Sequence, residues 1–145
     1  MVDHIASRPQ MWDMLDVLDE HFHKESKCYP TLAGGVTVTG AAGAWTLGSF
    51  AEIVPVNTIT EDFDIHFVNI ENANVEDTYE LRLYATTTEI ACVRFTTTQV
   101  AGRLIPAQTN VQTPIISANS QIQAKIASSS GGSDTATISL QYHVY

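Results

Sequence analysis

The feature that most limits how this chain can fold is a strict alternation of apolar and polar residues near its C-terminus. In the ranges 122–126 and 136–143 every second residue is apolar. The apolar sets are Ile122, Ala124 and Ile126 in the first run and Ala136, Ile138, Leu140 and Tyr142 in the second. Successive side chains of a β-strand point to opposite faces, so a period of two places each set on one face. The two runs therefore predict two strands, each with one buried face.

Shorter runs of the same kind recur upstream, each bounded by Gly, Pro or polar residues. They predict strands at 36–38, 44–47, 50–54, 63–67, 79–84, 89–96 and, more weakly because of Pro114, 111–116. The chain holds 17 Thr, 12 Val and 12 Ile against 8 Leu, and β-branched residues favour strands. About eight strands at a spacing near ten residues predict an antiparallel β-sandwich or jelly roll. The Ser- and Gly-rich range 128–134 is expected to be a mobile hairpin loop.

One helix is predicted before these strands, over 9–24. Its apolar residues recur at spacings of four, three and four and form one stripe, which consists of Met11, Leu15, Leu18 and Phe22. A helix of this length is not stable alone in water, so the stripe must pack on something. It either covers the β domain of its own chain or makes an oligomer or partner contact. We therefore expect an N-terminal arm and helix at 1–28 and a β-sandwich domain at 29–145.

Charge and hydropathy exclude several classes of function. The net charge is −9 over 145 residues, which disfavours binding to nucleic acid or to an anionic membrane. No stretch approaches the roughly 20 apolar residues of a membrane helix, and the first residues do not resemble a signal peptide. Cys28 and Cys92 are therefore expected to be reduced thiols in a cytosol.

Residues that could carry chemistry are scattered. His21 and His23 point to nearly opposite sides of a helix, so they do not share a metal ion easily. Asp62, Asp64 and His66 are expected to form the solvated face of a strand whose other face, Phe63, Ile65 and Phe67, is core. No nucleophile elbow or phosphate loop is present. We therefore expect no catalytic residue, no cofactor and no metal, and hence no enzyme.

Four aromatic residues could instead form a platform for a sugar ring. They are Trp12, Trp45, Tyr84 and Tyr142. Each of them also fits a core or interface position, because a pattern alone does not separate exposed from buried aromatics.

Several segments resemble a group of small virion proteins of tailed bacteriophages. The resemblance rests on residues 29–33, 44–48 and 62–67, and most of all on 114–127 and 139–145. It extends over nearly the whole chain, and its motifs are structural. It implies a head decoration, or cement, protein: a β-sandwich, often trimeric, that clamps the major capsid protein on the capsid surface of a virion assembled in the host cytoplasm. The acidic net charge suits an outer surface away from packaged DNA.

Two other functions remain open at this point. A tail or fibre module that binds a host surface glycan is the first, and exposed aromatics beside polar side chains would favour it. A small enzyme of the cupin type is the second, and a metal bound inside the barrel would favour it.

Overall fold

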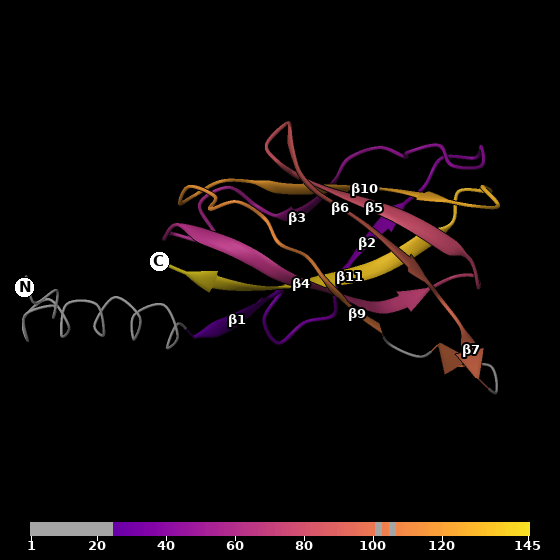
Figure 1. Cartoon of the computed structure of the whole chain (residues 1–145), viewed down its shortest axis with the longest axis horizontal. Coiled ribbons are helices and arrows are strands. Elements are labelled where there is room, and N and C mark those ends of the chain that lie inside the picture. The colour runs from indigo at the N-terminus through magenta and orange to yellow at the C-terminus, as the bar shows by residue number, and fades with distance from the viewer. Residues whose placement is uncertain (1–24, 101–102, 105–106) are drawn as a thin grey trace, which may run out of the picture.

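The computed structural model describes residues 25–100, 103–104 and 107–145, with the side chains of 99–106 excluded. This part is mostly β, with two antiparallel sheets that face one another in a sandwich-like arrangement (Figure 1). The predicted helix and its stripe Met11, Leu15, Leu18 and Phe22 lie outside the described residues, as do Trp12, His21 and His23. No helix among the described residues has the length and apolar character needed to cross a bilayer.

The first sheet, sheet A, is built around the last strand of the chain. β11 (Thr135–Val144) pairs on one side with β4 (Phe63–Ala73), which in turn pairs with β9 (Ala107–Asn110). On its other side β11 pairs with both β1 (Ser26–Tyr29) and β2 (Val36–Thr39), at successive stretches of its length. The sheet thus begins at Ser26, three residues before the expected start of the β domain.

The second sheet, sheet B, has four strands. In spatial order they are β3 (Ala51–Val54), β10 (Ile122–Ser128), β5 (Thr78–Ala85) and β6 (Thr88–Thr96). A separate two-stranded ladder, β7 (Gln99–Val100) and β8 (Arg103–Leu104), projects from one end of the domain (Figure 1).

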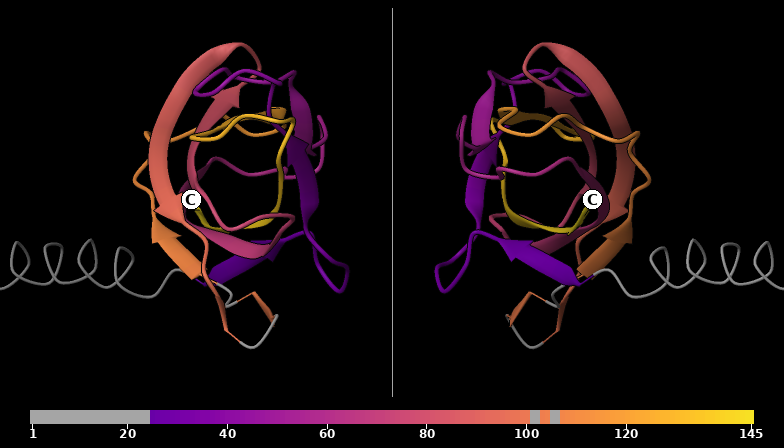
Figure 2. Two further views of the ribbon diagram at one scale, coloured as in Figure 1. Left: turned by 90° about the vertical axis from the view of Figure 1, so that its right-hand side faces the viewer. Right: turned by 90° about the vertical axis from the view of Figure 1, so that its left-hand side faces the viewer.

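The hydrophobic core lies between the two sheets, which surround it in the end-on views of Figure 2. The predicted inward sets of both C-terminal runs are confirmed, because every member from Ile122 to Tyr142 is at most 9% exposed. The inward set of β5, Tyr79, Leu81 and Leu83, is fully buried as well. Period-two burial on both sheets is the reason that these segments are strands.

The chain crosses between the sheets at most of its connections. β2, β4, β9 and β11 belong to sheet A, whereas β3, β5, β6 and β10 belong to sheet B. Of these eight strands only β5 and β6 are consecutive neighbours in one sheet. The expectation that 128–134 is a hairpin loop is therefore wrong: it joins β10 in sheet B to β11 in sheet A.

The same connection is also well packed. Ser128 and Asp134 are buried, and the Ser128 hydroxyl donates to Asp134 Oδ2 at 2.9 Å. Asp77, at the start of β5, accepts from the Ser129 hydroxyl and from the Ser130 amide and hydroxyl. Burial by itself raises the pKa of Asp77, but these hydrogen bonds hold it well below its usual range. A loop with such partners does not fit the expected mobile tip.

Two predicted strands differ from the structure. Residues 44–47 form no strand: Trp45 has a φ of 53°, and a turn closes from Gly43 to Thr46, whose amide donates to the Gly43 carbonyl. The strand that pairs with β4 is β9, which precedes the predicted strand 111–116. Within 111–116 only Ile116 forms a β-bridge, and its partner is Phe63.

A β-bulge changes the expected face of Phe67. Gln141 pairs with Phe67 and Tyr142 with Ile65, so His66 is an extra residue in β4. After the bulge the inward residues are Val68 and Ile70, and Phe67 is only half-buried. The prediction that Phe67 belongs to the core is therefore wrong, whereas Phe63 and Ile65 are buried as predicted.

Gly131 offers a direct test of the packed connection. Its φ is +77°, and an added Cβ would lie 2.5 Å from the Ala42 carbonyl oxygen. We expect Gly131→Ala to lower the free energy of unfolding by at least about 2 kcal/mol, from backbone strain plus the clash. Urea unfolding measures the change. The matched control is Gly34→Ala, where no atom lies within 4 Å of the added Cβ; equal stability of the two variants would contradict the packing described above.

Candidate functional site

The outer face of sheet B carries the main concentration of charged side chains on the strands. Alternation along β5 turns Glu80, Arg82 and Tyr84 away from the core, as predicted from the sequence. The register of β5 and β6 then places Arg94 opposite Glu80. Residues from two strands therefore meet on one solvated face.

Glu80 is the centre of this charged group. Arg82 donates to Glu80 Oε1 through Nε at 2.9 Å and Nη2 at 2.7 Å, and Arg94 Nε donates to Oε2 at 2.9 Å. Hydrogen bonds from Arg82, then from Arg94, lower the pKa of Glu80 below its usual value. The Glu80 side chain is 12% exposed, so its charge is held in place by two guanidinium groups.

Aromatic side chains flank this charged group. The segment between β2 and β3 runs beside β10, since the Trp45 amide donates to Ser128 and the Gly48 amide to Ile126. The Trp45 ring is exposed, and the Arg94 guanidinium lies 4.8 Å from its centroid. Phe50 packs edge-on against Tyr84 at 5.0 Å and lies under the Lys125 ammonium.

Together these residues shape a shallow depression of about 580 Å³, the Trp45 depression. Its walls are Trp45, Thr46, Leu47, Glu80, Arg82, Arg94 and Ala127. An aromatic face beside fixed hydrogen-bonding groups can bind a polar ring by stacking and hydrogen bonds. Among the predicted aromatic candidates, Trp45 contributes to this site and Tyr84 lies next to it, whereas Tyr142 is buried in the core.

A second group of polar residues lies at the end of sheet A. Asp64 and His66 are half-buried on the outer face of β4, and Asp64 Oδ1 is 3.0 Å from His66 Nε2. Asp62, predicted beside them, precedes β4 and accepts from the Ala118 amide instead. The structure adds His143, whose ring centroid is 4.2 Å from that of His66, and Tyr145, whose hydroxyl donates to Asp64 Oδ2 at 2.7 Å.

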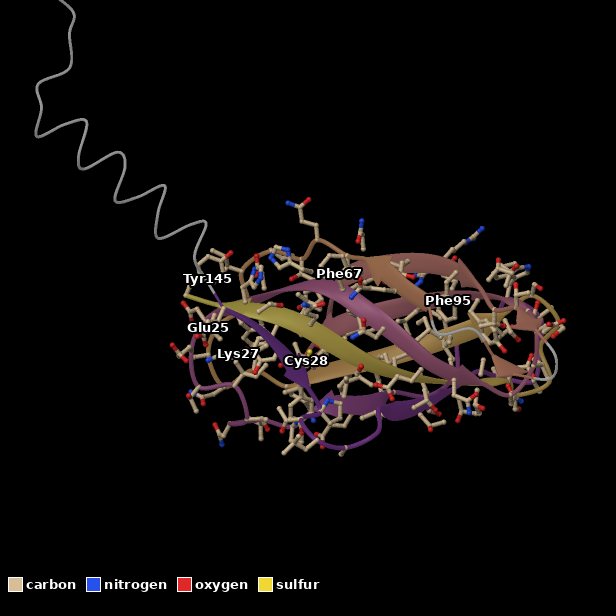
Figure 3. All side chains as sticks on the ribbon, turned by 90° about the horizontal axis from the view of Figure 1, so that it is seen from below. Glu25, Lys27, Cys28, Phe67, Phe95 and Tyr145 are labelled. Atoms are coloured by element: carbon tan, nitrogen blue, oxygen red, sulfur yellow. The ribbon has the colours of Figure 1, made fainter. Side chains whose placement is uncertain are left out.

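No local pattern in the sequence indicates that His143 and Tyr145 join this group, because they are far from Asp64 along the chain. The pairing of Asp64 with His143 across β4 and β11 brings them together. Only the antiparallel pairing of β4 with β11 could have indicated this grouping in advance. The C-terminal residue Tyr145 lies at the same end of the domain as Glu25 (Figure 3).

Both cysteines are free and exposed. Cys28 belongs to β1 in sheet A and Cys92 to β6 in sheet B.

Comparison with protein-family models, with curated protein sequences and with solved structures yields no match to this chain. The geometry of its own residues therefore carries the functional argument.

The charged group predicts a pH-dependent loss of stability in Glu80→Gln. We expect the free energy of unfolding at pH 7 to fall by about 1–2 kcal/mol, because charge-assisted hydrogen bonds are lost and the exposed Arg94 is partly screened. Because the pKa of Glu80 is lower in the folded protein than in the unfolded chain, its charge stabilises the fold at pH values above the unfolded pKa of roughly 4.3. This stabilisation is lost as the pH falls through the lower pKa of the folded protein. The difference in the free energy of unfolding between Glu80→Gln and the parent protein should therefore become smaller below about pH 4.

Urea unfolding at pH 7 and pH 3 measures this gap. Glu89→Gln is the matched control, since Glu89 accepts one longer bond from Arg82, of 3.3 Å, and is well exposed. A constant gap at both pH values would contradict the role given to the Glu80 charge.

Proposed function

We propose that this chain is a structural protein of a phage virion, a head decoration or cement protein with a jelly-roll fold. The observation that carries the proposal is the strand order. Counting β2 to β6 and β9 to β11 as strands one to eight, sheet A reads 1-8-3-6 and sheet B reads 2-7-4-5. This is the order of an eight-stranded jelly roll, an architecture used by viral capsid proteins, lectins and cupins.

Fold alone does not decide function, so the sequence resemblance to phage virion proteins supplies the second argument. In that role the protein binds the outer capsid surface and adds stability by mass action, because it binds the assembled shell and not its separated parts. The partner is the major capsid protein. The net charge of −9 suits a site away from DNA.

The outer face of sheet A is the surface that best suits such a contact. Its central part is a ladder of uncharged polar side chains joined by hydrogen bonds: Ser26, Asn69, Gln108, Ser139 and Gln141. On an acidic protein this uncharged central part of the face allows another subunit to approach with little charge repulsion there. The side chains are already ordered by one another, so binding costs less rotamer entropy.

The copy number of the chain in purified particles tests the proposal. We expect a number of copies comparable to that of the major capsid protein, on the order of hundreds per particle, since every exposed repeat of the shell offers the same site. Quantitative mass spectrometry of purified virions against labelled standards gives the ratio. A handful of copies would place the chain in the tail and contradict the decoration role.

The stripe Met11, Leu15, Leu18 and Phe22 is proposed to hold copies of the chain together as a trimer. Replacing Leu15 and Leu18 by Asp should break the oligomer and leave the β domain folded, because it places charges in an apolar seam. Light scattering measures the mass and circular dichroism the fold. An intact oligomer would contradict the seam, and complete unfolding would show that the helix packs on its own domain.

The Trp45 depression favours one alternative, a tail or fibre module that binds a host surface glycan. An exposed indole beside Glu80 and Arg82 has the stacking face and hydrogen-bonding groups that sugars need. A low copy number in the particle would support this alternative.

The cupin-type alternative has less support. Between the sheets the buried side chains of the described residues are almost all apolar, and no histidine is among the buried residues there. The histidines that do gather, His66 and His143, lie on the outer face.

A further inference from the structure

We propose that Asp64, His66 and His143 bind one divalent transition-metal ion of the zinc class on the outer face of sheet A. This inference does not depend on the virion role proposed above. Among the described residues this is the group of three His, Cys, Asp or Glu side chains whose ligand atoms all lie within 4.8 Å of one another. Two imidazoles and one carboxylate are a donor set that suits zinc and its neighbours.

The separations are close to those that a metal requires. Zinc binds nitrogen and oxygen at about 2.0–2.2 Å, so donors around one tetrahedral ion lie roughly 3.3–3.6 Å apart. Asp64 Oδ1 and His66 Nε2 are 3.0 Å apart, and one ligand atom from each of the three residues lies within 4.8 Å of the other two. Binding of one ion would therefore require rotation of these side chains until the donor separations reach those values.

The backbone holds these residues in position. Asp64 and His143 are direct partners in the pairing of β4 with β11, so their spacing is set by the sheet. The bulge at His66 leaves that residue on the same outer face. Ligands on paired strands are placed more accurately than ligands on loops, which favours a defined geometry.

The surroundings complete the arrangement that metal sites use. The Tyr145 hydroxyl donates to Asp64 Oδ2 at 2.7 Å, which orients the carboxylate and leaves Oδ1 on the side of His66. His66 also lines a depression of about 460 Å³ with Phe67, Asn110, Val111 and Gln112, so solvent reaches this ligand residue. An acidic protein also attracts a dication.

Zinc titration of the full chain tests the site. After treatment with a chelator and dialysis, calorimetry with Zn²⁺ should show one ion per chain. His66→Gln and His143→Gln should each weaken binding at least 10-fold, and Tyr145→Phe about 10-fold, the loss typical of an outer hydrogen bond. Cobalt(II) should give a visible absorption band that the two glutamine variants lose.

The double variant His21→Gln/His23→Gln is the control, since it removes two histidines outside the proposed site and should keep full affinity. Absence of zinc binding, or binding that survives His66→Gln, would overturn the proposal and leave Asp64 and His66 as a hydrogen-bonded pair. Circular dichroism establishes that each variant is folded; if His143→Gln is not, the His66 and Tyr145 variants decide. A negative result for zinc binding does not change the expected copy number in virions, so the metal site and the virion role are tested independently.

Discussion

Burial of alternating side chains between the two sheets is the interaction on which the rest of the structure depends. β11 is central to it, because it pairs with β4 on one side and with β1 and β2 on the other. Its inward residues Ala136, Ile138 and Leu140 are almost completely buried. A slip by one residue would expose all of them, so this burial fixes the register of sheet A. The register in turn decides which polar side chains meet on the outer face.

Polar residues close one end of this core. Ser128 and Asp134 are buried beside each other where the chain crosses from β10 to β11, and Asp77 binds the serines between them. Buried polar groups are tolerated only when they are hydrogen-bonded, and the short side chains of serine and the positive φ of Gly131 allow that here. The Ser- and Gly-rich composition therefore serves close packing in this connection, where composition alone suggested a flexible tip.

The two outer faces have different chemistry. Sheet B presents the Glu80 ion pairs and the exposed indole of Trp45, which suit a small polar ligand. Sheet A presents an uncharged ladder around Gln108 and Gln141, with the Asp64 group at its end. The proposed metal ligands Asp64 and His66 belong to β4 and His143 belongs to β11, so an ion there would link these two strands.

The sequence by itself determined the β class, the two C-terminal strands and the inward sets of β5, β10 and β11, because period-two burial is a local property. It also placed Glu80, Arg82, Asp64 and His66 on solvated faces. Tertiary structure alone decided that 128–134 joins two sheets, that a bulge turns Phe67 outward, and that His143 and Tyr145 meet Asp64. Those outcomes depend on which strand pairs with which, a non-local choice made by packing of the whole core.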